Sequence, residues 1–209
     1  MRILGIDGSP RKEGNTHAFL NTALDRAAEL GADTHHIWLG DKHLRGCRGC
    51  YACVEAKHCV VEDDFPSIFE EMMKADGILL GSPVYHASMT AELKALLDRA
   101  GFSGRWAGNA MKNTGENYQW SNCILSGKVV APITVARRTG QTLAFAEILM
   151  WAACNDGIIV GNAYWNMGMA GKGGAIDAEN DTEGLGIMRG LAERMVHAIE
   201  KLNPEKEGD

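Results

Sequence analysis

Short apolar runs alternate with amphipathic segments along most of this 209-residue chain, and no other feature constrains its fold as strongly. Apolar runs of about four to eight residues favour buried strands, and apolar positions recurring about every 3.6 residues favour helices. Strands that alternate with helices predict a parallel sheet covered by helices on both faces. We expect strands at 2–7, 33–39, 76–82, 128–135 and 157–160, and helices at 15–30, 65–74, 89–100, 142–153 and 182–202.

Five strands joined in this way predict one flavodoxin-like, doubly wound α/β domain over residues 1–209, with strand order 2-1-3-4-5. Three segments depart from the alternation. Residues 44–62 are rich in cysteine, residues 101–126 read as an insertion or extended loop, and residues 161–174 are rich in glycine. Ligands of such sheets bind outside the carboxyl ends of the strands, so we expect binding residues in the loops after strands one, three and four.

Composition narrows the class of protein. The hydrophobic content of 45% is enough for one full core, and the net charge of −6 is spread along the chain. We find no basic run of the kind that binds nucleic acid and no apolar stretch near the roughly 18 residues that span a bilayer. The first residues, Met1 to Asp7, read as a strand rather than a signal peptide. We therefore expect a cytoplasmic protein, in which thiols stay reduced and cysteines more often bind metal than form disulfides.

Four cysteines with the spacing C-x2-C-x2-C-x5-C stand out: Cys47, Cys50, Cys53 and Cys59. Thiolates on successive short turns can hold the corners of an iron–sulfur cluster. Four thiolates brought together repel one another, so a bound cation is expected among them. The glycines before Cys47 and Cys50 allow sharp turns toward sulfur, and Arg45 and Arg48 add positive charge that should raise a cluster's reduction potential.

Two other interpretations of the cysteines stay open. Structural zinc usually takes two cysteine pairs with a longer spacer between them, and redox-active thiols are a third interpretation. Asp63 and Asp64 follow the motif, and we expect them to cap the next helix rather than bind metal. Of the two isolated cysteines, Cys123 and Cys154, the latter lies in an apolar helical stretch and is expected in the core.

The loop after the first strand has the composition of a phosphate site. Its glycines allow close approach of backbone N–H groups, Arg11 and Lys12 add positive charge, and the following helix directs its positive end at the loop. The loop matches neither a P-loop nor the G-x-G-x-x-G fingerprint, and an ordinary turn before a capped helix is the alternative. The candidate binding residues here are Ser9, Arg11, Gly14, Asn15 and Thr16.

The loops after the third and fourth strands complete the candidate site. Tyr85 can lie against a flat ring, and backbone N–H groups beside it can face the ring's polar edge, whereas a lone His86 is more typical of a solvated loop. Two arginines in the next loop can stabilise an anion or receive a nicotinamide phosphate, although a solvated loop also accounts for Arg138 and its neighbour. The candidate binding residues in these two loops are Pro83, Val84, Tyr85, Ala136, Arg137 and Gly140.

The segments Ser9-Pro10-Arg11, Gly14-Asn15-Thr16 and Gly81-Ser82-Pro83-Val84-Tyr85 resemble the NAD(P)H-dependent FMN reductase branch of flavodoxin-like proteins. With the four cysteines and the following Asp63-Asp64, the chain resembles the iron–sulfur flavoproteins of anaerobic archaea and bacteria. The resemblance implies one FMN and one [4Fe–4S] cluster per subunit, and a homodimer or tetramer in which the two centres meet near a subunit interface. It also implies ferredoxin as electron donor, with dioxygen, peroxide or quinones as acceptors.

We therefore expect an electron-transfer flavoprotein that couples one-electron donors such as ferredoxin to two-electron chemistry at FMN. No side chain need act as an acid or base, because the cofactors carry the chemistry. An NAD(P)H-dependent FMN or quinone reductase without a cluster is the first alternative. The second is a carrier or redox sensor without enzymatic activity.

Overall fold

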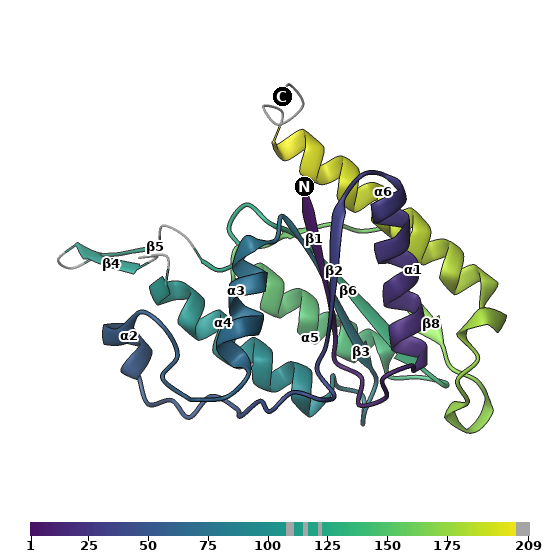
Figure 1. Cartoon of the computed structure of the whole chain (residues 1–209), viewed down its shortest axis with the longest axis horizontal. Helices are drawn as coiled ribbons and strands as arrows, with labels where there is room; N and C mark the ends of the chain where they lie inside the picture. The colour runs from purple at the N-terminus through teal and green to yellow at the C-terminus, as the bar shows by residue number, and fades with distance from the viewer. Residues whose placement is uncertain (108–110, 115–116, 121–122, 204–209) are drawn as a thin grey trace.

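A six-stranded parallel sheet lies between two layers of helices in the computed structural model, which describes residues 1–107, 111–114, 117–120 and 123–203 (Figure 1). The strands of this sheet are β1 (Arg2–Asp7), β2 (Asp33–Trp38), β3 (Gly77–Pro83), β6 (Val129–Ala136), β7 (Ile158–Ile159) and β8 (Met167–Met169). On one face lie α1 (Asn15–Glu29) and α6 (Thr182–Leu202). On the other lie α3 (Phe65–Lys74), α4 (Ala91–Ala107) and α5 (Gln141–Cys154).

The strand order β2-β1-β3-β6-β7 confirms the expected flavodoxin-like order, since these are the five main strands in sequence. Asp7, the last residue of β1, pairs with Gly81, which in turn pairs with Ile133 of β6. The carboxyl ends of these three strands are therefore level with one another. The loops that follow them meet at one edge of the sheet, as expected for a doubly wound fold.

The central strands feed two separate cores, which explains their continuous apolar sequence. Ile78 and Leu80 of β3 pack on the α3, α4 and α5 side, and Leu79 between them packs on the α1 and α6 side. All three side chains are fully buried. Successive strand residues point to opposite faces, so a strand covered on both sides must be apolar throughout.

The last position of the sheet differs from the expectation. We predicted one strand at 157–160 followed by a glycine-rich stretch, but that stretch contains β8. Strand β7 pairs only with Val129 and Val130 of β6, and β8 pairs with residues 134–136 at its other end. Because β7 is too short to reach the end of β6, β8 supplies hydrogen-bond partners for the backbone of residues 134–136. Buried backbone N–H and C=O groups require such partners.

The prediction of an insertion or extended loop at 101–126 was wrong for its first part, because α4 continues to Ala107. The helix accepts two glycines there because they allow close packing. A β-carbon at Gly104 would come within 2.5 Å of Ile124, and one at Gly101 within 3.0 Å of Trp151 and Asn155. Further along, β4 (Met111–Thr114) and β5 (Asn117–Trp120) form an antiparallel hairpin, and residues 108–110, 115–116 and 121–122 lie outside the described residues.

The expected burial of Cys154 was also wrong, since this last residue of α5 is exposed. It lies two positions beyond the buried Ala152, and two residues turn a helix by roughly 200°, which places Cys154 on the opposite side. Among the described residues, no helix is both long and apolar enough to cross a bilayer.

Candidate functional site

The loops at the carboxyl edge of the sheet enclose a cavity of about 180 Å³. Ten of the eleven residues that the sequence nominated line it; only Gly140 does not. The lining residues are Ser9, Arg11, Gly14, Asn15, Thr16, Pro83, Val84, Tyr85, Val135, Ala136, Arg137, Ala170 and Gly174. The structure therefore brings together four segments far apart in sequence, the three nominated loops and the stretch after β8.

Buried hydrogen bonds fix the first of these loops against the sheet. The Gly8 N–H donates to the Gly81 carbonyl at 2.8 Å, and the Thr90 hydroxyl donates to the Gly8 carbonyl at 2.7 Å. A β-carbon at Gly8 would lie 3.0 Å from the Gly81 oxygen and 2.9 Å from Leu93, so only glycine fits here. Thr90 was not among our sequence candidates, because it lies 82 residues from its partner.

The amino end of α1 offers free N–H groups to this cavity. Gly14 is the N-cap, and no side chain in the described structure caps the helix or places acidic charge in its first turn. The Ser9 hydroxyl accepts from the Arg11 N–H at 3.1 Å, which curls the loop around the helix end. Uncapped helix N–H groups with the positive end of the helix dipole form an anion site.

A second loop, which follows β8, closes over the first. The Asn15 amide donates to the Ala175 carbonyl at 2.8 Å and accepts from the Asp177 N–H at 2.9 Å. Arg11 donates to the Gly174 carbonyl at 2.8 Å. The Asn15 side chain thus ties two loops together in addition to lining the cavity. Sequence reasoning missed this loop because its partners lie about 160 residues away.

The opposite wall of the cavity is a tight turn after β3. The Val84 N–H donates to the Val135 carbonyl at 2.8 Å, and Tyr85 and Ser88 pair across the turn. The two central residues, His86 and Ala87, have φ values of 50° and 64°, a strained conformation for residues other than glycine. The Tyr85 side chain remains 49% exposed at the rim, where a flat ring could stack on it.

The remaining candidates in these loops divide into lining and supporting residues. Arg137 lines the cavity, whereas Arg138 and His86 are exposed residues that do not. Gly140 begins α5 behind the turn with a φ of +95°, and a β-carbon there would come within 3.2 Å of the Ala87 backbone. Its contribution in this structure is to let α5 approach the turn.

All four motif cysteines line a second, smaller cavity. Cys47 and Cys50 are exposed, Cys53 is buried and Cys59 is half-buried. Burial raises the pKa of the Cys53 thiol, and the neighbouring Cys59 and Cys50 raise it further. Thiolates at Cys50, Cys53 and Cys59 would therefore repel one another, and a bound cation would relieve that repulsion.

The backbone around these cysteines is irregular. The segment contains one short helix, α2 (Ala52–Ala56), and the residues on either side of it, Tyr51 and Lys57, have φ values of 59° and 62°. Gly49 has a φ of 60°, which fits the turn expected before Cys50. Residues other than glycine keep such values only where their surroundings enforce them.

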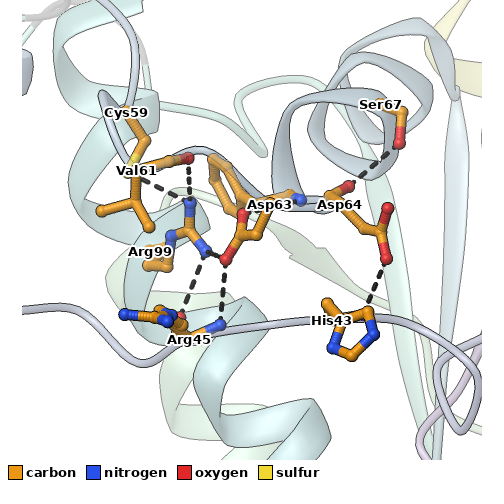
Figure 2. Close-up of polar contacts among 9 residues, drawn as sticks. His43, Arg45, Cys59, Val61, Asp63, Asp64, Ser67 and Arg99 are labelled. Atoms are coloured by element: carbon orange, nitrogen blue, oxygen red, sulfur yellow. Dashed lines mark hydrogen bonds and ion pairs between the residues drawn. The ribbon is translucent and has the colours of Figure 1, made fainter.

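One buried arginine holds the segment to the rest of the domain (Figure 2). Arg99 of α4 is 1% exposed, and its guanidinium lies 2.5 Å from the Asp63 carboxylate. It also donates to the Arg45 carbonyl at 3.1 Å and to the Cys59 sulfur at 3.3 Å. Sequence reasoning missed Arg99, because it lies on the buried side of α4 and its partners are 36 or more residues away in the chain.

Asp63, which directly follows the cysteine segment, is the carboxylate that pairs with Arg99. Burial alone would raise the pKa of its carboxyl, but hydrogen bonds from Arg99 and from the N–H groups of Arg45 and Phe65 outweigh burial and lower the pKa. The expected capping of α3 is met only in part: Asp63 accepts from the Phe65 N–H at 3.1 Å, whereas Asp64, the N-cap residue, makes no side-chain cap bond. Asp64 instead accepts from the His43 N–H at 2.7 Å, which fastens the chain ahead of the cysteines.

The two cavities have no lining residue in common. Figure 1 shows α2 at one end of the longest axis of the domain, beyond α4 from the loop that joins β1 to α1. A molecule bound at the strand ends and an ion or cluster bound by the cysteines would therefore occupy separate parts of one chain.

A flavodoxin-like sheet with an anion site at the start of α1 and a tyrosine beside it is a ligand site of the doubly wound type, and the family match makes its class a flavin-dependent oxidoreductase. The family model for NADPH-dependent FMN reductase matches residues 1–172. An iron–sulfur flavoprotein of Methanocaldococcus jannaschii is 34% identical over 203 residues, covering 95% of this chain and 97% of the relative. An iron–sulfur flavoprotein of Methanosarcina thermophila is 31% identical over 209 residues, covering 99% and 100%. The chain belongs to the iron–sulfur flavoprotein family within the FMN reductase group.

Solved structures agree on the fold. RosB with a bound riboflavin-5′-phosphate derivative has a TM-score of 0.74 at 19% identity, covering 98% of this chain and 81% of that one. An NADH:FMN oxidoreductase in its apo form has a TM-score of 0.56 at 18% identity, covering 100% and 91%. The family and the cavity together support FMN as the cofactor of this chain.

Proposed function

We propose that the protein transfers electrons between a [4Fe–4S] cluster on Cys47, Cys50, Cys53 and Cys59 and an FMN bound at the strand ends. One-electron donors such as ferredoxin would thereby be coupled to two-electron chemistry at the flavin. The observation that carries the proposal is that the four motif cysteines line one cavity of a flavodoxin-like domain. Bound flavin supplies both one- and two-electron chemistry, and the cluster supplies single electrons.

The residues of the strand-end cavity fit the parts of FMN. The free N–H groups at the start of α1, with Ser9, Thr16 and the Arg11 guanidinium, would receive the phosphate. Val84 and Tyr85 would lie along the isoalloxazine, and Arg137 would stand over its anionic edge or over a nicotinamide phosphate. None of these side chains needs to give or take a proton for this role.

The spacing of the four sulfurs supports a cluster over a single zinc ion. A tetrahedral zinc with Zn–S bonds of about 2.3 Å would bring its sulfurs to about 3.8 Å of one another. Within the described residues, no three of the four sulfurs lie mutually within 4.8 Å. The Arg99 hydrogen bond to Cys59 adds positive charge at one corner, which favours the reduced form of a net-negative cluster.

The separation of the two cavities favours a homodimer or tetramer in which the cluster of one subunit faces the flavin of another. Exposed apolar side chains on α5 and after β7 support such an assembly, since large exposed apolar patches mark interaction sites. They include Leu143 and Met150 on α5, 61% and 72% exposed, and Trp165 after β7, 57% exposed. With reduced thiols as cluster ligands, we place the protein in the cytoplasm.

Anoxic purification followed by metal, sulfide and flavin analysis tests the proposal. We expect about four iron, four acid-labile sulfide and one FMN per chain. Zinc without sulfide would overturn the cluster, and so would iron-free protein that retains full activity with ferredoxin. For the flavin site, Arg11→Ala should weaken FMN binding about tenfold and leave riboflavin binding unchanged, since only FMN carries the phosphate. Lys12→Ala is the control, because Lys12 lies outside the cavity lining.

A second candidate is an NAD(P)H-dependent FMN or quinone reductase that works without a cluster. The position of Arg137 on the cavity wall favours it, because a nicotinamide phosphate could pair there. Steady-state oxidation of NADPH by a Cys47→Ser, Cys50→Ser double variant separates the two. Unchanged turnover supports the second candidate, and loss of ferredoxin-linked turnover alone supports the first.

A further inference from the structure

We infer that Asp7, His17 and His36 form a metal site separate from the cysteines, which takes a divalent transition ion such as Zn²⁺. Asp7 ends β1, His17 lies in the first turns of α1, and His36 lies in β2 beside them. The three side chains converge between the helix and the sheet. This site goes beyond the flavin and cluster of the proposed function and does not depend on either.

The Asp7 carboxylate already stands close to a metal-binding distance from each imidazole. Asp7 Oδ2 lies 3.6 Å from His17 Nδ1 and 3.7 Å from His36 Nε2, and all three atoms lie within 4.8 Å of one another. A tetrahedral zinc with bonds of about 2.1 Å to nitrogen and oxygen separates its ligand atoms by about 3.4 Å. The observed spacing needs shifts of only a few tenths of an ångström for Asp7 to share an ion with each imidazole.

None of these three atoms has another partner. Asp7 is fully buried, and Oδ2, His17 Nδ1 and His36 Nε2 are all buried atoms without a hydrogen bond in the described structure. A buried acceptor or donor left unsatisfied costs about 1–3 kcal/mol, and more when charged. Three such atoms aimed at one point are explained by a cation that binds all of them.

The donor set selects the kind of ion. Two imidazoles and one carboxylate suit zinc or ferrous iron, whereas calcium and magnesium prefer oxygen alone. The other ring nitrogen of His17, Nε2, lies 2.7 Å from the side-chain amide nitrogen of Asn21. An imidazole that binds metal through Nδ1 donates its Nε2–H, so on metal binding the Asn21 amide would turn over to present its oxygen as the acceptor. His36 also lines an open cavity with Trp38 and Lys42, which Asp7 and His17 do not line.

The second oxygen of Asp7 links this site to the phosphate loop, because Oδ1 accepts the Ser9 N–H at 2.8 Å. A bare carboxylate beneath an anion site opposes anion binding, and a divalent ion on its other oxygen would reverse that charge. Occupancy should therefore strengthen FMN binding. This consequence alone rests on the proposed function, and the metal titration below stands without it.

Calorimetric titration of anoxically purified, chelator-dialysed protein with ZnCl₂ tests the site. We expect one equivalent per chain that is weakened by more than roughly 100-fold in His17→Ala and in His36→Ala. His35→Ala is the matched control, since His35 directly precedes His36 in β2 and contacts Glu71 instead. Cobalt bound in place of zinc should show no sulfur-to-metal absorption, because no cysteine takes part.

Equal zinc affinity in the wild type and both histidine variants would overturn the inference, and so would cobalt spectra that show sulfur ligation of that equivalent. Asp7→Asn serves if a histidine variant fails to fold, because it keeps the side-chain volume and the acceptor for Ser9. It should lose zinc while retaining its far-ultraviolet circular dichroism. Retention of zinc by folded Asp7→Asn would also count against the site.

Discussion

The strand-end cavity and the cysteine cavity are built in opposite ways. The first lies where three level strands end, and buried backbone hydrogen bonds such as that from Gly8 to Gly81 hold its loops. The second lies in a segment of which only residues 52–56 are helical, with Cys47 and Cys50 exposed. Among the described residues, a buried ion pair between Arg99 and Asp63 and an edge-on ring contact between Tyr51 and Phe102 join that segment to α4.

The difference indicates how each site depends on its ligand. A site on the ends of packed strands keeps its shape when empty, because the sheet determines it. A segment with few buried contacts and strained backbone is stabilised by whatever its cysteines bind, as in small metal-binding folds. The two regions should therefore respond independently to substitution.

The largest effect is expected from Cys50→Ser. Cys50 is exposed, so the substitution removes a ligand without leaving a cavity. Iron and acid-labile sulfide should fall at least tenfold, since a weakly bound three-thiolate cluster is readily lost, while the FMN content stays at the wild-type level. Metal, sulfide and flavin assays on the same anoxic preparation measure all three.

Cys154→Ser is the matched control, an exposed cysteine outside the motif whose loss should leave iron unchanged. Parallel loss of FMN and iron in Cys50→Ser would show that the two regions are not independent. It would contradict the comparison even if the cluster itself were confirmed.

Arg99→Met should have the next largest effect. It leaves the Asp63 carboxylate buried without its partner, and breaking a buried ion pair in this way costs about 3–5 kcal/mol of the free energy of unfolding. The guanidinium also lies 4.1 Å from the centre of the Phe65 ring, a contact that methionine keeps only in part. Urea denaturation measures the loss.

Arg48→Met provides the control for Arg99, because Arg48 lines the same cavity from an exposed position. Its effect should stay within about 0.5 kcal/mol. Replacing both members of the pair, Asp63→Leu with Arg99→Met, should recover much of the loss, because no unpaired charge then remains. A cost of Arg99→Met below about 1 kcal/mol would mean that other contacts hold the segment.

The sequence predicted the sheet order and the strand-end residues because both follow from local patterns. Strand periodicity fixes which residues face each core, and the doubly wound topology then places the loops after β1, β3 and β6 at one edge. Gly140 was the exception. The loop that contains Gly140 has the composition of a binding loop. In the structure Gly140 instead lets the Ala87 backbone approach closely, a packing contact that no local sequence pattern reveals.

Contacts between segments far apart in the chain could not be predicted from the sequence. Arg99 reads as one polar position on an amphipathic helix, yet it is buried because Asp63, 36 residues earlier, folds back onto it. The same holds for Asn15 and the loop at 174–177, and for the pairing of β8 with β6. A buried arginine is detectable only when the surface that buries it is known.

Gly8→Ala tests the rigidity of the strand-end cavity. The new β-carbon would lie about as close to the Gly81 carbonyl as a hydrogen-bonded atom, and the backbone must shift to accept it. We expect a loss of about 1–3 kcal/mol in stability and weaker FMN binding, with iron content unchanged. Gly186→Ala is the control, since a β-carbon there meets open space in α6 and should stabilise the helix by up to about 1 kcal/mol. Unchanged FMN affinity in Gly8→Ala would show that the loop adapts to its ligand.

The smallest effect concerns the protonation of one carboxyl group, that of Asp63. Its pKa lies below the ordinary value of 3.8 in the folded protein, so the ionised form contributes stability above that pH. This contribution is lost as the pH falls through 3.8 toward the lower folded value. The difference in free energy of unfolding between the protein with Asp63 and its Asp63→Asn variant should therefore be constant from about pH 7 to 5 and decrease below about pH 4. Urea denaturation in the Cys50→Ser background avoids acid loss of the cluster, and a gap that persists undiminished to about pH 3 would contradict the ion pair as the stabilising contact.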